Sequence, residues 1–163
     1  MLSVGSKFLS RIAHIAIVLA TIVLLTVPGT RSFAAEPYGA WIAEKGVVLE
    51  IFNCNGLLCG RIVWLQAPLD VAGQPVRELA NPVVALRPRL ICGMTVLQGL
   101  RLAGPGVWDR GSFYDPRDGK RYSVTMKLSS DDEIVANIYA GSAVFGRTER
   151  LLRVRRLHTA GWC

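Results

Sequence analysis

The chain has 163 residues, is 51 % hydrophobic, and carries 19 basic against 12 acidic side chains, for a formal net charge of +7. That length suits one domain of ordinary size. It is too short for two such domains once the N-terminal segment described next is excluded. The aromatic side chains do not interleave with the basic ones as in a nucleic-acid stacking platform, so we expect no nucleic-acid partner.

Residues 1–34 have the pattern of a cleaved signal peptide. A basic start without acids precedes an apolar run over residues 12–27, which a Pro-Gly pair ends. Ser32 and Ala34 then occupy the −3 and −1 places of a small-residue cleavage site, which predicts cleavage after Ala34. An uncleaved anchor is the alternative, but the run is shorter than the about 20 apolar residues of a membrane span.

Cleavage would leave residues 35–163, 129 residues with 16 basic and 12 acidic side chains and a net charge of +4. This length predicts a single domain with a core at about residues 37–155 and no transmembrane span after cleavage. Export implies a periplasmic or secreted protein. All four cysteines lie in this part, and an even count in an oxidising compartment predicts disulfides.

The mature domain opens with Gly39-Ala40-Trp41. A tryptophan at this place could plug one end of a barrel while an arginine of the last strand packs across its face, a cation–π contact. The alternative is a tryptophan that simply packs in the core.

The first hairpin is predicted from an alternating run over residues 46–53, the turn signal Asn55-Gly56, and a returning run over residues 59–65. In the returning run, Ile62 and Trp64 share one face of the strand.

Cys54 and Cys59 flank this turn, and we favour a disulfide between them. A four-residue loop would set them opposite each other, whereas a two-residue turn would offset them diagonally, which is poorer geometry. The connectivity of Cys92 and Cys163 stays open.

Residues 67–91 interrupt the alternation with four prolines and a glycine. Asn81-Pro82 resembles an N-cap followed by a first helical residue, so residues 82–86 are predicted to form one helical turn. A segment of this length is either a lid across a barrel mouth or a packed structural loop.

Further strands are predicted at residues 94–100, 121–128, 134–139 and 145–154. The clearest is 121–128, where Tyr122, Val124 and Met126 alternate with polar residues, so that one face is buried and the other is wet. Many short strands at nearly regular spacing predict an all-β barrel or sandwich.

Five arginines gather near the end of the chain: Arg147, Arg150, Arg153, Arg155 and Arg156. They are consistent with a solvated terminal strand or with a surface that contacts anionic lipid or polysaccharide.

No catalytic constellation is recognisable. The only histidine of the mature part is His158, so a Ser-His-Asp set and a zinc site are not expected. Asp115 and Asp118 lie in one turn signal, where aspartates bond to their own backbone, and with Asp109 they are the only nearby acids that an enzyme could use. We therefore expect no enzyme, no metal and no cofactor.

Several stretches together resemble domain-of-unknown-function family 2147, small exported bacterial proteins with lipocalin-like β-barrels. The matching stretches are Gly39-Ala40-Trp41, residues 58–65, Asn81-Pro82, Cys92-Gly93-Met94, Trp108, residues 113–116, Asp118-Gly119-Lys120, Tyr122 and Phe145-Gly146-Arg147.

The resemblance implies a lipocalin-like antiparallel up-and-down barrel of about eight strands with one long loop. It implies no established activity. Glu149-Arg150-Leu151 stands where the family tends to place an aromatic residue, so that either Arg147 or Arg153 could face Trp41. Gly39, next to this closure, would also be a structural residue.

Two hypotheses of function follow. The first is a binder or carrier of a small, partly apolar or amphipathic molecule, held by inward-facing residues such as Trp64, Tyr122, Val124 and Met126. The second is an envelope interaction protein that docks a protein or glycan through its lid or its outer surface, and it predicts an exposed apolar patch.

Overall fold

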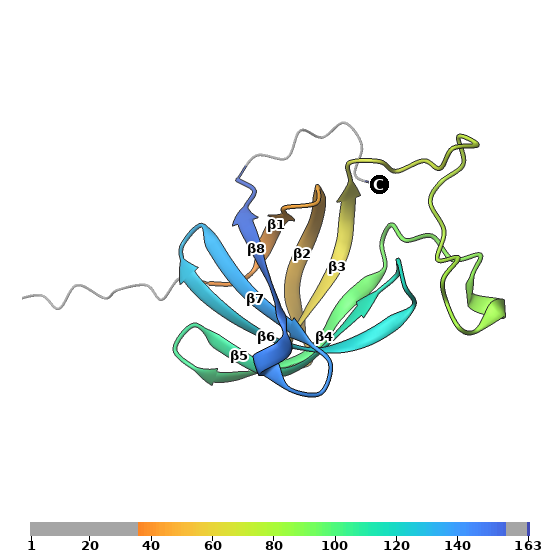
Figure 1. Ribbon diagram of the computed structural model, residues 1–163. Coiled ribbons are helices and arrows are strands. Elements are labelled where there is room, and N and C mark those ends of the chain that lie inside the picture. The colour runs from red at the N-terminus through yellow and green to blue at the C-terminus, as the bar shows by residue number, and fades with distance from the viewer. Residues whose placement is uncertain (1–35, 156–162) are drawn as a thin grey trace, which may run out of the picture. The chain divides into compact units, whose positions relative to one another are not determined.

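The structure, a computed structural model, describes residues 36–155 and residue 163. The predicted signal peptide, Arg156 and His158 lie outside the described residues. The described part forms eight β-strands and two short 3₁₀ helices (Figure 1): β1 (Gly39–Ala43), β2 (Val47–Cys54), β3 (Leu57–Leu65), η1 (Val84–Leu86), β4 (Thr95–Gly104), β5 (Val107–Asp115), β6 (Lys120–Ser130), β7 (Glu133–Tyr139), η2 (Ala143–Phe145) and β8 (Arg147–Arg153).

The strands close into an up-and-down barrel. Each strand pairs antiparallel with the next one along the chain, and β8 pairs back onto β1, where Trp41 lies opposite Arg153. This confirms the predicted all-β, lipocalin-like barrel of eight strands, and closure leaves no free sheet edge. The connectors β1–β2, β3–β4, β5–β6 and β7–β8 share one end, called the open end below. The other connectors lie at the closed end.

Strand β6 shows why the alternating sequence forms a barrel wall. Val124 and Met126 are buried in the interior, whereas Thr125 between them is half-buried and Ser123 and Lys127 on either side are exposed. The predicted two-residue period holds here because the pairing with β7 runs without interruption from Ser123 to Leu128. Interior side chains from all eight strands form one apolar core.

The hairpin of β2 and β3 turns through Asn55 and Gly56, both in the left-handed backbone region with φ of 57° and 81°. The turn has two residues, so Cys54 lies opposite Leu57 and is diagonal to Cys59. The disulfide Cys54–Cys59 forms nonetheless, with 5.9 Å between the two Cα atoms. The predicted pair is confirmed, and the tight turn that we expected to be less favourable brings the cysteines within bridging distance.

A second disulfide joins Cys92, at the end of the long β3–β4 connector, to Cys163, and spans 71 positions of the chain. The backbone N–H of Cys163 also donates a hydrogen bond to the carbonyl of Val63. The last residue is therefore held against the end of β3.

The closed end is plugged by Trp41, whose side chain is 0 % exposed. The guanidinium of Arg153 lies 4.1 Å above its ring, and the indole N–H donates to the carbonyl of Pro37. The same arginine donates to the carbonyls of Tyr38 and Glu36, so it ties the entering chain to the last strand. Arg153 rather than Arg147 is thus the arginine that faces Trp41, which settles the alternative left by the sequence.

The closure needs a glycine at position 39 because of the backbone conformation there. Its φ of 110° is a conformation that other residues rarely adopt, and an added Cβ would lie 3.7 Å from the Arg153 guanidinium.

The terminal arginines do not form one basic patch. Arg150 pairs with Glu133 and Arg155 pairs with Asp132, whereas Arg147 lies at the open end and Arg153 covers Trp41. Each described member of the cluster therefore has its own partner on the barrel.

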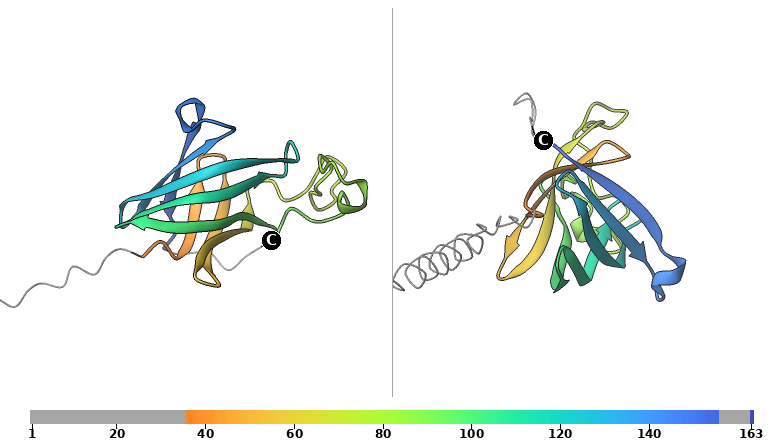
Figure 2. Two further views of the ribbon diagram at one scale, coloured as in Figure 1. Left: turned by 90° about the horizontal axis from the view of Figure 1, so that it is seen from below. Right: turned by 90° about the vertical axis from the view of Figure 1, so that its left-hand side faces the viewer.

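The β3–β4 connector, residues 66–94, projects beyond the ends of the strands (Figure 2). Its helical turn is the 3₁₀ helix η1, which begins two residues later than predicted. Asn81 is not its N-cap, because the cap position is Val83. The Asn81 side chain accepts a hydrogen bond from the Val83 N–H and turns its amide toward Glu78 instead.

Candidate functional site

The barrel interior contains a cavity of about 380 Å³ in its open half. Strand residues make most of the wall, and residues 67, 76 and 91 of the long connector complete it. The apolar lining includes Leu49, Ile62, Val96, Val124, Ala136 and Leu151. Trp41 closes the other end, so the cavity opens only toward the connectors of the open end among the residues that the structure describes.

The four residues predicted to face a ligand lie in different places. Val124 lines the cavity. Tyr122 lies opposite Phe113, a lining residue, but does not itself line the cavity; its ring lies beside Arg147, which does. Met126 is buried in the core but does not border the cavity.

Trp64 is the exception, since the prediction that it faces inward is wrong. Leu49 pairs with Ile62, but the adjacent Val48 pairs with Trp64, so Val63 is an extra residue in β3. A bulge of one residue reverses the faces of the strand beyond it. Trp64 consequently shares the outer face with Val48, and Leu65 takes the inward position.

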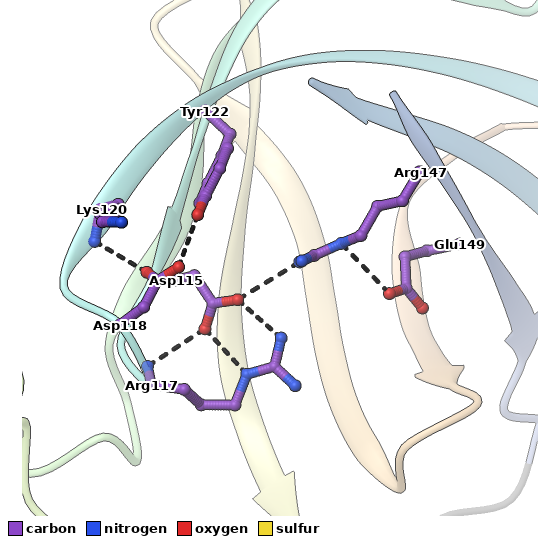
Figure 3. Close-up of polar contacts among 7 residues, drawn as sticks. All are labelled: Asp115, Arg117, Asp118, Lys120, Tyr122, Arg147 and Glu149. Carbon is purple, nitrogen blue, oxygen red and sulfur yellow. Dashed lines mark hydrogen bonds and ion pairs between the residues drawn. The ribbon is translucent and has the colours of Figure 1, made fainter. Parts of the chain in front are cut away.

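A charged cluster spans the mouth of this cavity (Figure 3). The carboxylate of Asp115, on β5, accepts hydrogen bonds from the Arg117 side chain at 2.9 and 2.6 Å and from Arg147 at 3.2 Å. Because β5 and β8 are not neighbours in the barrel, the contact between Asp115 and Arg147 crosses the interior. Glu149 lies 3.5 Å from the other side of the Arg147 guanidinium.

Asp115 is 2 % exposed and remains ionised. Burial alone would raise the pKa of this carboxyl, but the hydrogen bonds and charges of Arg117, with that of Arg147, outweigh it and lower the pKa to about 2. A carboxylate held in this way cannot donate a proton at neutral pH. At neutral pH the cluster therefore presents fixed charges at the cavity mouth.

Aromatic rings support the Arg147 side chain from the interior. Its guanidinium carbon lies 6.0 Å from the centre of the Phe113 ring and 5.8 Å from that of Tyr122. The Tyr122 hydroxyl donates to the Asp118 carboxylate, and this hydrogen bond raises the pKa of the tyrosine. The mouth thus combines two rings with charged groups in one continuous surface.

A second polar cluster, missed from the sequence, fixes the long connector to the barrel. Glu78 is 0 % exposed, and its carboxylate accepts hydrogen bonds from Tyr114, Asn81 and Arg89. Burial raises the pKa of Tyr114 to about 12, with the Glu78 hydrogen bond as the next cause. The sequence around Glu78 resembles that of an ordinary solvent-exposed loop, and no neighbouring residue indicates that its side chain is buried.

A wider hollow of about 840 Å³ lies outside the barrel, between the long connector and the outer side of β4, β5 and β6. Arg121 stacks over the Tyr114 ring at its edge, 5.4 Å from the ring centre. We take the interior cavity as the candidate site, because rigid strands form its walls and a few polar groups meet an apolar lining there.

Other kinds of site find no support in the described residues. Within residues 36–155 and 163, no group of three or more His, Cys, Asp or Glu side chains is placed to hold a metal ion. No helix in the described part of the chain is long and apolar enough to cross a membrane.

Comparisons with known proteins agree with the fold. The family model described as "Uncharacterized protein conserved in bacteria (DUF2147)" matches residues 39–153. A search of curated proteins returned no significant match. A solved structure described as "Protein HP1028 from the human pathogen Helicobacter pylori belongs to the lipocalin family" is similar to this chain, with a TM-score of 0.64 and 24 % identity over 74 % of this chain and 84 % of that one. This likeness shows a lipocalin-like fold.

Proposed function

The chain belongs to the bacterial family DUF2147, and from this premise we propose that it is an exported, non-enzymatic protein that binds or carries a small, partly apolar molecule inside its barrel. The observation that carries the proposal is the interior cavity of about 380 Å³. Sites for small molecules typically measure about 300–1,000 Å³, whereas a single water needs only about 10–15 Å³. The cavity is thus far larger than a packing defect.

The lining suggests the chemistry of the ligand. Aliphatic side chains such as Val96 and Leu151 surround the depth of the cavity, and the charged lining residues Asp115, Arg117, Arg147 and Glu149 form one cluster toward the open end. An apolar body would lie against the aliphatic wall, and a polar end would meet Arg147 and Arg117. A wholly polar ligand would leave its hydrogen-bonding groups unsatisfied in the depth of the barrel.

The charges at the mouth support a binding role rather than catalysis. Asp115 is held ionised by two arginines, and Asp118 is engaged by the Tyr122 hydroxyl and the Lys120 backbone N–H. Asp109 lies near the closed end of β5, beside Arg110. The three acids are thus not gathered around one reacting position.

Export to an oxidising compartment is supported by the two disulfides, since such bonds persist in secreted and periplasmic proteins. We place the protein in the periplasm or outside the cell on this ground, together with the predicted signal peptide.

Displacement of the fluorescent apolar probe N-phenyl-1-naphthylamine from the purified, delipidated protein tests the proposal. Ala136 lines the cavity and its neighbour Val135 faces outward on the same strand, so Ala136→Phe fills the cavity while Val135→Phe adds the same ring outside. We expect Ala136→Phe to weaken probe binding at least tenfold and Val135→Phe to bind like the wild type. Equal binding by the two variants would exclude the cavity as the site.

A further inference from the structure

In the long connector, residues 66–94, polar side chains are buried and many apolar side chains are exposed. Two of its buried residues are polar, namely Glu78 and Asn81, and they are held by hydrogen bonds rather than by apolar packing. Most of its large aliphatic side chains point to solvent, including Val83 at 53 % and Val84 at 68 % exposure, whereas Val76 and Ile91 line the cavity. A connector of this kind has a defined shape and an apolar exterior.

Exposed apolar side chains are concentrated in the long connector. Of the eleven large hydrophobic residues that are exposed in the described part of the chain, six lie in residues 66–94: Leu69, Val71, Leu79, Val83, Val84 and Leu90. The others are Val144 and Phe145 of the β7–β8 connector, and Tyr38, Leu102 and Leu152 toward the closed end. The long connector projects beyond the strands, and the β7–β8 connector points in a different direction (Figure 2). Scattered exposure needs no explanation, but a gathering of this size indicates an interaction site.

The connector also carries uncompensated positive charge. Arg77 donates to the carbonyl of Pro88, and Arg87 donates to that of Asn81, so neither guanidinium is neutralised by a carboxylate there. The one exposed acid of the connector is Asp70, whose carboxylate accepts from the backbone of its own turn.

We propose that the exposed side of the long connector, residues 66–94, docks onto the surface of an anionic lipid bilayer. Aliphatic side chains would enter the boundary between headgroups and acyl chains, and the arginines would meet the anionic headgroups. A bilayer suits this surface because polar residues separate the apolar tips along the connector. A fluid surface adapts to such tips, whereas a protein partner would need a matching pocket for each.

The docked orientation has a consequence for the cavity. Residues 67, 76 and 91 of the same connector line the cavity, so docking would turn the mouth toward the lipid. A partly apolar molecule could then pass between bilayer and barrel with little exposure to water. Docking does not depend on the cavity being a binding site, and membrane docking and ligand binding are measured in separate experiments.

Flotation of the full mature protein with large unilamellar vesicles tests the proposal. Vesicles of phosphatidylcholine with 30 % phosphatidylglycerol are compared with vesicles of phosphatidylcholine alone, at low and at physiological salt. We expect binding to the anionic vesicles that weakens with salt and is at least tenfold weaker without phosphatidylglycerol.

Matched variants locate the contact. The double variant Val83→Asp, Val84→Asp should lose at least tenfold in vesicle affinity, because removing a buried valine from an apolar environment costs more than a factor of ten in binding. Leu102→Asp places one aspartate at a 70 % exposed leucine near the closed end, which matches the single variant Leu79→Asp of the connector, and it should bind like the wild type. Leu79→Asp is a second variant of the connector, and unchanged thermal unfolding checks that each protein is folded.

Three results would overturn the proposal. These are no flotation of the wild type with anionic vesicles, equal loss in the Val83→Asp, Val84→Asp and Leu102→Asp variants, and association that requires an envelope protein in the vesicles. The last result would identify the surface as a protein docking site. Probe binding by Ala136→Phe is read independently, so either claim can fail alone.

Discussion

The guanidinium of Arg147 lies 3.2 Å from the carboxylate of Asp115, across the mouth of the barrel from β8 to β5. Neither strand pairs with the other, so this contact is a bridge over the cavity and not part of the sheet. Arg117 approaches the same carboxylate from the β5–β6 turn. The bridge joins opposite walls and fixes the charged groups beside which a ligand would pass.

This bridge predicts a dependence of stability on acid. The pKa of Asp115 is lowered to about 2 in the folded protein, below its ordinary value of 3.8. Its contribution to the free energy of unfolding is therefore fully present above about pH 4 and is lost as the pH falls toward 2. Asp115→Asn should lower stability at pH 7 by about 1.5–3 kcal/mol, the usual range for hydrogen bonds to a charged group, and the difference from wild type should shrink toward pH 2.

Urea unfolding at a series of pH values measures this difference. Asp109→Asn is the control, because that aspartate is partly exposed and 3.9 Å from Arg110, so its effect should be small. A difference for Asp115→Asn that stays constant down to pH 2 would contradict the role of the bridge.

At the closed end, Arg153→Met should destabilise the barrel. The change removes the cation–π contact with Trp41 and the hydrogen bonds to the carbonyls of Tyr38 and Glu36, for an expected loss of about 2–4 kcal/mol. Arg153→Lys should recover little of this, because an ammonium cannot reproduce the flat, forked guanidinium. Arg150→Met, which breaks an exposed pair at 3.9 Å, should cost under about 1 kcal/mol. Guanidinium chloride unfolding compares the three, and similar losses for Arg153→Met and Arg150→Met would refute the closure.

The Glu78 cluster predicts an unusual tyrosine. Because the pKa of Tyr114 is raised to about 12, its ionisation should be the last step of an alkaline absorbance titration, and its contribution to stability should be lost between about pH 10 and pH 12. Tyr114→Phe should remove this step, whereas Tyr38→Phe should leave it in place. In Glu78→Gln the step should move to lower pH, because the carboxylate that repels the phenolate is gone. A last step that is the same in Tyr114→Phe and wild type would show that the hydroxyl is not buried against Glu78.

The two disulfides should differ in their effect on stability. In the chain-entropy picture, a bond that closes a long loop stabilises more, so Cys92–Cys163 at a separation of 71 should contribute about 4 kcal/mol and Cys54–Cys59 at a separation of 5 about 2 kcal/mol. Paired Cys→Ser variants measured by denaturant unfolding test the order. Equal losses, or a larger loss for Cys54→Ser with Cys59→Ser, would go against it.

How much of this molecule can be predicted from its sequence depends on where the local pattern is unbroken. Val124 and Met126 are placed correctly because β6 alternates without a bulge in that stretch. Trp64 is misplaced because one extra residue in β3 reverses the faces, and a bulge leaves no mark in the pattern of hydrophobicity. Strand β5 is not predicted by the sequence pattern for a related reason, since its register shifts between Trp108 and Gly111 and Arg110 adopts a φ of 56°.

Contacts between distant parts of the chain are the least predictable. The Cys54–Cys59 pair is evident because a hairpin brings neighbours together, whereas Cys92–Cys163 depends on the course of the whole barrel. Trp41 could be assigned to a closure, yet only the register of β1 with β8 selects Arg153 over Arg147. The bridge from Arg147 to Asp115 joins walls that are not neighbours, and no local pattern in the chain marks it.

Native mass spectrometry of the protein purified gently from its own host tests the central claim most directly. We expect a bound small molecule of a few hundred daltons that is released on unfolding, is retained in Val135→Phe, and is absent from Ala136→Phe. A protein that emerges without any bound small molecule, or one in which Ala136→Phe retains the same molecule as the wild type, would contradict the proposal that the barrel cavity is a binding site.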